Sequence, residues 1–184
     1  QRTVQWDAYH IENYLLDEHY IFLVLEDLEA TSTITNIDKV VDGLKLCAKE
    51  VIDFHHQHEL NLYVKSEVLN SLNFSSKGDT EREQEFHDSI KRSVVTLNEK
   101  IDTELSRNNL IKVGTRIRQN LEDSLIDNLW KSDINGRMIL KKFVGKYCSG
   151  VRYERFRNLI ISKMKADNFQ PKGMKKVVET ILKN

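Results

Sequence analysis

The apolar residues of this chain recur mostly at intervals of three and four, the spacing that places side chains on one face of an α-helix. Three such stripes occupy the middle of the sequence. The first covers residues 37–72 with a predicted break near His58, and the others cover 86–105 and 110–129. No stripe continues beyond about five turns. The pattern therefore favours an antiparallel helical hairpin or small bundle over a long coiled coil.

Shorter helices are predicted on both sides of this region. Asp17 is a good N-cap for a helix over 18–28, and Asn36 can cap the helix that follows a polar, β-branched linker. Near the other end, the pattern predicts three short helices at 137–147, 152–167 and 172–182, the last preceded by Pro171 at its first turn. Residues 3–6 are predicted to form a short strand, and 74–80 a loop. The expected fold class is mainly α.

Composition describes a globular chain with a sizeable core. Its 184 residues are 40% hydrophobic and 30% charged, with one Pro and seven Gly. No run of eighteen apolar residues predicts a membrane span, and Gln1 to Trp6 lacks the apolar core of a signal peptide. The beginning resembles the middle of a domain, so we expect a piece of a longer protein. Two distant cysteines, Cys47 and Cys148, suit half-buried free thiols in a reducing, cytoplasmic compartment.

Charge is distributed unevenly along the chain. Residues 137–184 contain 13 Lys and Arg but three Asp and Glu, a net charge of +10. Because the whole chain is neutral, residues 1–136 carry −10. A basic end of this kind is a candidate surface for nucleic acid. The alternatives are that the two parts pair with each other, or that both present solvated faces.

One segment near the start resembles a known family. Residues 10–16, His-Ile-Glu-Asn-Tyr-Leu-Leu, resemble a signature of Toprim-like domains fused to, or partnered with, ABC-type ATPases of the overcoming-lysogenisation-defect (OLD) kind. Residues 135–143, 156–160 and 170–175 are similar to closing elements of the same proteins, in the same order. The resemblance covers roughly a third of the chain, and the middle matches only in being helical.

This resemblance implies the C-terminal part of a metal-dependent DNA nuclease that works with an ATPase domain or subunit in bacterial anti-phage defence. It implies Mg²⁺ or Mn²⁺ as the cofactor of the full-length protein, since hard cations prefer oxygen ligands. The early Glu and the Asp-x-Asp pair of such a site would lie upstream of Gln1. On this reading, residues 1–35 end a Toprim-like α/β core, 36–131 form a helical bundle, and 132–184 form a basic helical unit.

Glu12 is the candidate catalytic carboxylate, because it lies within an aromatic and aliphatic stretch where a buried acid must be paired or bound to metal. By resemblance it is an outer carboxylate of the metal site. The alternative is a structural acid, paired locally with Arg2 or His10. Asp7 and Asp17 are weaker acidic candidates, and Asp17 is better explained as a helix cap.

The run His55-His56-Gln57-His58-Glu59 places potential zinc ligands one helical turn apart. Zinc would need further ligands from elsewhere, and the sequence has no H-E-x-x-H or CxxC to supply them, so solvated or half-packed histidines are the simpler interpretation. The sequence also has no phosphate-binding glycine-rich loop and no G-x-S-x-G. ATP binding by this chain alone and an independent hydrolase activity are therefore disfavoured.

The basic end supplies the candidate nucleic-acid contacts. Cations that could follow a phosphate backbone, with Tyr147 and Tyr153 between them, are Lys141, Lys142, Lys146, Arg152, Arg155, Arg157, Lys163 and Lys165. The alternative is that these are solvated, with Arg157 bonded to a carboxylate of the acidic part. A different class of function also fits the middle helices: a non-catalytic protein-interaction or oligomerisation module, in which the apolar stripes stay partly exposed.

Overall fold

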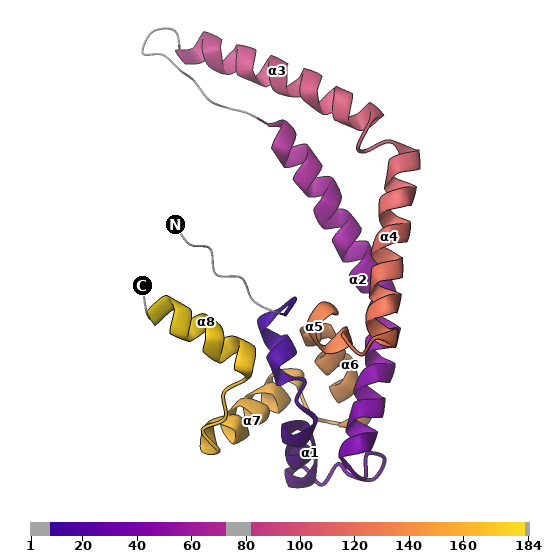
Figure 1. The fold of residues 1–184 in the computed structure, drawn as a ribbon, viewed down its shortest axis with the longest axis vertical. Helices are drawn as coiled ribbons and strands as arrows, with labels where there is room; N and C mark the ends of the chain where they lie inside the picture. Colours follow the sequence, from indigo (N-terminus) through magenta and orange to yellow (C-terminus); the bar gives the residue numbers. More distant parts are fainter. Residues whose placement is uncertain (1–7, 73–81, 183–184) are drawn as a thin grey trace. The chain divides into compact units, whose positions relative to one another are not determined.

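The computed structural model describes residues 8–72 and 82–182, and in these ranges all regular structure is helical. The predicted mainly α class is thus confirmed. The expected strand at 3–6 and loop at 74–80 lie outside the described residues, so no α/β edge is shown. In chain order (Figure 1) the elements are η1 (Ile11–Leu15), α1 (Glu18–Asp27), α2 (Ile37–Ser71), α3 (Arg82–Asp102), α4 (Arg107–Ile126), α5 (Trp130–Asp133), α6 (Gly136–Tyr147), α7 (Tyr153–Ala166) and α8 (Lys172–Leu182).

The chain divides into two compact units. Unit 1 comprises residues 1–53 and 121–184, and unit 2 comprises 54–120. Helix α2 therefore contributes its first half to unit 1 and its second half to unit 2. These divisions fall at different residues from the three-part division expected from the sequence.

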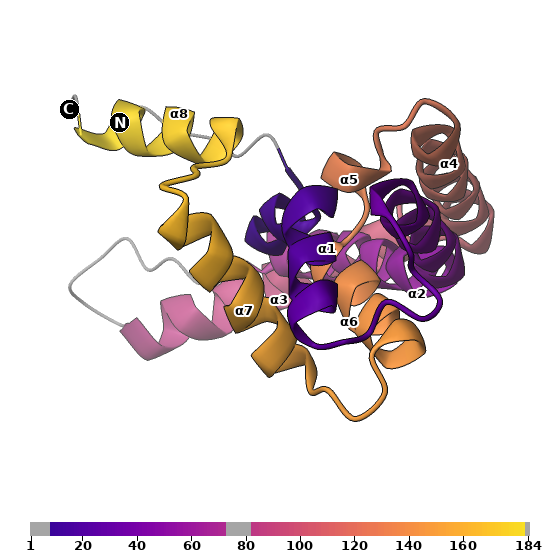
Figure 2. The ribbon, with the colours of Figure 1, turned by 90° about the horizontal axis from the view of Figure 1, so that it is seen from below.

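Unit 1 brings the two ends of the sequence together around one apolar core. Helix α1 packs along α7, and η1 packs against both α6 and α7 (Figures 1 and 2). Burial of these apolar side chains is the main favourable contribution to the unit's stability. The fully buried core residues include Leu16, Ile21, Leu25, Leu44, Trp130, Ile134, Ile139, Leu140, Phe143, Phe156 and Ile160.

Local signals set most helix ends as predicted. Asp17 Oδ1 accepts from the backbone N–H of His19 and Tyr20, at 3.0 and 3.2 Å. Asn36 Oδ1 likewise accepts from the N–H of Lys39 at 2.9 Å. These bonds satisfy donors that have no partner inside the helix. Helix α8 follows Pro171 directly and has the predicted bounds.

Two features of the helices differ from the prediction. Helix α2 runs unbroken through His58 for 35 residues. The predicted break there was wrong, because no Pro or Gly near this position removes or weakens a backbone hydrogen bond. The single-turn helix α5 was not predicted, since four residues are too few to show a helical period.

Unit 2 contains the second half of α2, helix α3 and the first part of α4. Polar contacts link these helices: Lys100 pairs with Glu67, and the Tyr63 hydroxyl lies 3.1 Å from Glu104 Oε2. The apolar stripes are less covered here than in unit 1, as many large apolar side chains are at least 38% exposed. The exposed apolar side chains of α3 are what the alternative interaction module would require. None of the helices in the described ranges is long and apolar enough to cross a membrane.

Candidate functional site

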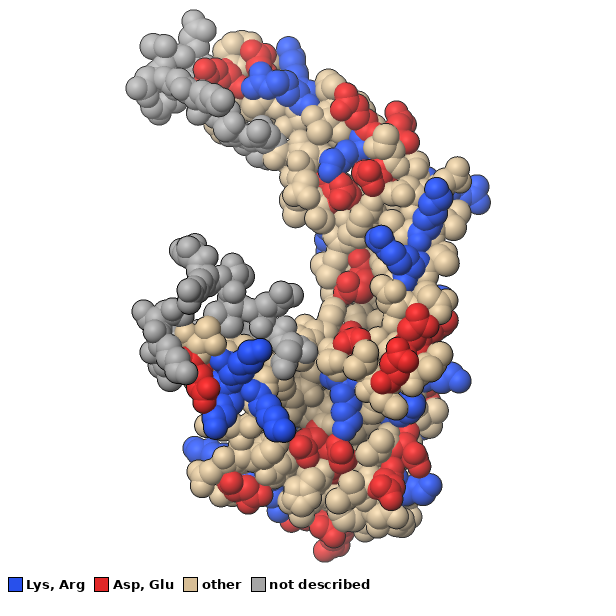
Figure 3. Space-filling model, in the orientation of Figure 1, with Lys and Arg blue, Asp and Glu red and all other residues tan. Residues whose placement is uncertain are grey.

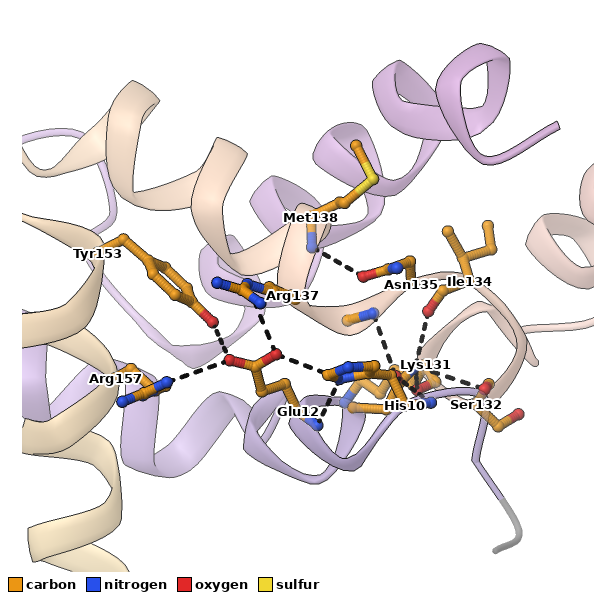
Figure 4. A network of polar contacts seen from close by, with 12 residues as sticks. His10, Glu12, Lys131, Ser132, Ile134, Asn135, Arg137, Met138, Tyr153 and Arg157 are labelled. Carbon is orange, nitrogen blue, oxygen red and sulfur yellow. Dashed lines mark hydrogen bonds and ion pairs between the residues drawn. The ribbon is translucent and has the colours of Figure 1, made fainter. Parts of the chain in front are cut away.

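Glu12 lies at the centre of a polar cluster in unit 1, and its side chain is 9% exposed. Oε1 accepts a hydrogen bond from the Tyr153 hydroxyl at 2.5 Å and lies 3.5 Å from Arg157 Nη1 (Figure 4). Oε2 has His10 Nδ1 at 3.2 Å and Arg137 Nε at 3.9 Å. The carboxylate is therefore enclosed by donors and cations from η1, α6 and α7.

His10 contacts both the backbone and the side chain of Glu12. It is the N-cap of η1, and its Nδ1 lies 3.3 Å from the backbone N of Glu12 as well as near the Glu12 carboxylate. Nδ1 can serve only one of these contacts at a time, since accepting from the N–H requires a lone pair and donating to the carboxylate requires a proton. In either state His10 holds the start of η1 in place.

Asn13 joins η1 to the segment between α5 and α6. Its amide nitrogen donates to the carbonyls of Lys131 and Ile134 at 2.9 and 2.6 Å. Its Oδ1 accepts from the backbone N–H of Gly136 at 3.1 Å and of His10 at 3.0 Å. One buried side chain thus satisfies backbone groups from both ends of the sequence, which would be costly to leave unpaired.

The surroundings of Glu12 do not fit a divalent cation. Two guanidinium groups lie within 4 Å of the carboxylate oxygens and the Tyr153 hydroxyl donates to Oε1, so a metal ion here would be repelled by like charge at short range. No group of three or more His, Cys, Asp or Glu in the described residues is placed to hold a metal ion. The geometry favours the structural alternative, in which His10 is a predicted partner of Glu12. Arg157 was expected to bond to some carboxylate of the acidic part, and that carboxylate is Glu12. Arg2 and Asp7 lie outside the described residues.

Sequence reasoning did not identify Tyr153 and Arg137 as partners of Glu12. Tyr153 is buried, and burial together with the nearby Glu12 carboxylate raises the pKa of its hydroxyl. The hydroxyl therefore remains protonated and available as a donor. Tyr153 and Arg157 are four residues apart on α7, so the sequence indicates that they share one face of this helix. It does not indicate that both contact Glu12.

The histidine run does not converge on one point. His55 is 1% exposed with Nε2 3.5 Å from Glu59 Oε1, and burial lowers the pKa of its imidazole. His56 Nε2 lies 3.0 Å from the carbonyl oxygen of Gly114, while His58 is exposed. His56 also lines a groove of about 640 Å³ between α2 and α4, together with Leu60, Leu105, Arg107, Leu110, Ile111, Gly114, Thr115 and Arg118. The three rings have separate environments.

The predicted nucleic-acid cations fall into two sets. Lys142 and Lys146 both pair with Glu50, at 3.4 and 2.6 Å, Arg157 pairs with Glu12, and Lys163 pairs with Asp27 at 2.7 Å. An ion-paired cation has less charge to offer a phosphate.

A second set of four residues is exposed and, among the described residues, takes part in no ion pair: Lys141, Arg152, Arg155 and Lys165. Of the eight predicted cations, only these four present uncompensated positive charge. The face available to a phosphate backbone is thus smaller than the sequence alone predicts.

Both cysteines are buried rather than half-buried. Burial raises the pKa of the Cys47 thiol, further raised by Glu50, and of the Cys148 thiol, each to about 11. Neither thiol is therefore ionised enough to act as a nucleophile near neutral pH.

Comparisons with protein-family models, with curated proteins and with solved structures found no match to this chain.

Proposed function

We propose that this chain is a non-catalytic helical scaffold within a Toprim-like, metal-dependent DNA nuclease that works with an ABC-type ATPase in anti-phage defence. The observation that supports this is the meeting of three segments that resemble that family. Residues 10–16 contact 135–143 through Asn13 and Gly136, and contact 156–160 through Glu12 and Arg157. If these three segments are characteristic parts of one fold, they are expected to contact one another in the structure, as they do here.

In this proposal Glu12 and the side chains that contact it (His10, Arg137, Tyr153 and Arg157) form a structural joint: they hold the end of the nuclease core against the basic helices. The carboxylates expected upstream of Gln1 would bind Mg²⁺ or Mn²⁺, whereas Glu12 stabilises the packing of the scaffold and binds no metal. The cations around Glu12 support this division of roles, since they stabilise its charge without a metal.

The DNA contact in this proposal is made through phosphates and carries no sequence information. Lys141, Arg152, Arg155 and Lys165 are the predicted cations with charge to offer. Binding of the chain to duplex DNA, measured by fluorescence anisotropy across a salt titration, should weaken steeply as salt rises. The logarithm of the binding constant falls by about 0.9 per phosphate contact for each tenfold rise in salt.

Changing Lys141, Arg152 and Arg155 together to Glu should abolish binding at low salt. The matched control changes three exposed cations of unit 2, Lys65, Lys91 and Lys112, to Glu and so alters the net charge equally. Equal loss in both triple variants would show a non-specific charge effect. No binding of the unaltered chain at low salt would remove the DNA contact from the proposal.

A second function, docking of a protein surface, is favoured by one specific observation in unit 2. Helix α3 exposes Phe86, Ile90, Val94 and Ile101 at 45 to 52% of their surface. Exposed apolar side chains that are neighbours on one face are typical of interaction surfaces. An apolar fluorescent dye should bind the dilute chain, and Val94→Asp should reduce this binding more than Val95→Asp. Equal binding by both variants would contradict docking at this face.

A further inference from the structure

Helix α3 packs through one face and displays its apolar residues on another. The buried positions are Ser89 and Ser93, at 2% and 3% exposure. At about 100° per residue, the line through Phe86, Ile90 and Val94 is centred roughly a quarter-turn around the helix from this buried face. Most of the apolar stripe therefore lies outside the face that α3 uses within its own chain.

The two outer pairs of this stripe have the same spacing when read from either end. Phe86 and Ile90 are four residues apart, as are Leu97 and Ile101, and seven residues separate the two pairs. Val94 lies near the middle of the stripe. A two-fold axis there would place the Phe86 of one copy against the Ile101 of another, as an isologous interface requires.

We propose that the α3 stripe is a homodimer interface, in which the α3 helices of two copies pair antiparallel about an axis near Val94. This inference rests on the docking role proposed above and names its partner as a second copy of this chain. Antiparallel pairing also sets the opposite helix dipoles side by side, which is electrostatically favourable.

Charge supports a second copy over a strongly acidic or basic partner. Residues 54–120 contain ten Lys and Arg and ten Asp and Glu, so unit 2 is neutral and does not repel itself. Both signs are interspersed over α3 and α4 in Figure 3. Between Phe86 and Ile101 the acidic residues of α3, Asp88 and Glu99, lie on the side of Val95, away from the stripe; Glu83 is in line with the stripe, one turn before Phe86. Acidic side chains are thus kept out of the proposed contact between Phe86 and Ile101.

The size of the stripe sets the expected strength of the dimer. Five partly exposed apolar side chains along four turns would bury roughly half of the ~800 Å² per partner that a standard stable interface buries. The dimer is therefore reversible and expected in the micromolar range.

Val94 and Val95 provide a matched pair for testing this. They are adjacent and of one residue type, and they are 52% and 58% exposed on different sides of α3. Because both native thiols are buried, an engineered surface thiol is the reactive one. Under mild oxidation at roughly micromolar concentration, the Val94→Cys variant should form disulfide-linked dimers at least about tenfold faster than Val95→Cys.

Sedimentation equilibrium supplies the second measurement. The unaltered chain should show a concentration-dependent dimer, with a dissociation constant raised at least about tenfold by Val94→Asp and unchanged by Val95→Asp. Equal cross-linking of both Cys variants would overturn the proposal. So would a chain that stays monomeric: if that monomer binds the apolar dye through the stripe, docking of a different protein survives, and if it does not, the docking function fails as well.

Discussion

Asn13 and Gly136, which are 123 residues apart in sequence, are in direct contact in unit 1. The Gly136 N–H donates to Asn13 Oδ1 at 3.1 Å, and a Cβ added at Gly136 would lie 2.6 Å from Asn13 Cα. A backbone atom cannot rotate away as a side chain can. The close packing of η1 on the start of α6 therefore requires glycine at this position.

Gly136→Ala should lower the free energy of unfolding by about 1–3 kcal/mol, because α6 must move away from η1 to admit the methyl group. The control lies in the same helix. Gly145 has no atom within 4 Å of an added Cβ, so Gly145→Ala should raise the free energy of unfolding by about 0.5–1 kcal/mol through helix propensity. Urea denaturation measures both changes. A neutral Gly136→Ala variant would mean that η1 does not pack on α6 as described.

The end of α1 offers a stabilising change. Glu29 has φ of 53°, in the left-handed region, while the N–H of Ala30 reaches back to the carbonyl of Leu25 at 2.9 Å. This is the arrangement in which glycine is preferred. Glu29→Gly should therefore stabilise the chain by roughly 0.5 kcal/mol, whereas the same change at the exposed, helical Glu26 should cost about 1 kcal/mol. Thermal unfolding of the two variants compares them directly; a loss of stability in Glu29→Gly would contradict the prediction.

The two cysteines predict how stability changes at high pH. Burial raises the pKa of each thiol from 9.0 to about 11, so the unfolded chain releases these protons first. The thiols' contribution to stability is then full below pH 9 and is lost as the pH rises to 11. Urea unfolding at several pH values should show this fall, with a smaller slope between pH 9 and 11 in a variant carrying Ala at both Cys47 and Cys148. An unchanged slope would exclude the thiols as its cause.

The contact between Glu12 and Tyr153 can be measured by a double-mutant cycle. Each of Glu12→Gln and Tyr153→Phe should lower the free energy of unfolding, since each weakens the buried hydrogen bond. Their joint effect should differ from the sum by about 0.5–3 kcal/mol. Effects that simply add would show that the two side chains do not interact.

Local signals predicted more of this structure than long-range ones. The caps at Asp17 and Asn36 and the position of Pro171 could be recognised because each acts on backbone groups within a few residues. The pairing of Glu12 with Tyr153 could not be predicted, since it depends on how α7 packs against η1. Periodicity also identified the apolar side of α3 but not that α3 packs through Ser89 and Ser93. The relation of the chain to Toprim-like nucleases stays a prediction.

The most direct test of the account is thermal unfolding of the chain and of Glu12→Gln, each with and without 10 mM Mg²⁺ or Mn²⁺ (about 100 times a typical weak dissociation constant). If Glu12 is a structural joint, Glu12→Gln unfolds at a lower temperature by the same amount in every condition, and neither metal stabilises the unaltered chain. A metal bound by Glu12 would add about 2.7 kcal/mol to the unaltered chain at that concentration, and nothing to the variant. Such a metal-dependent difference between the two proteins would contradict the account.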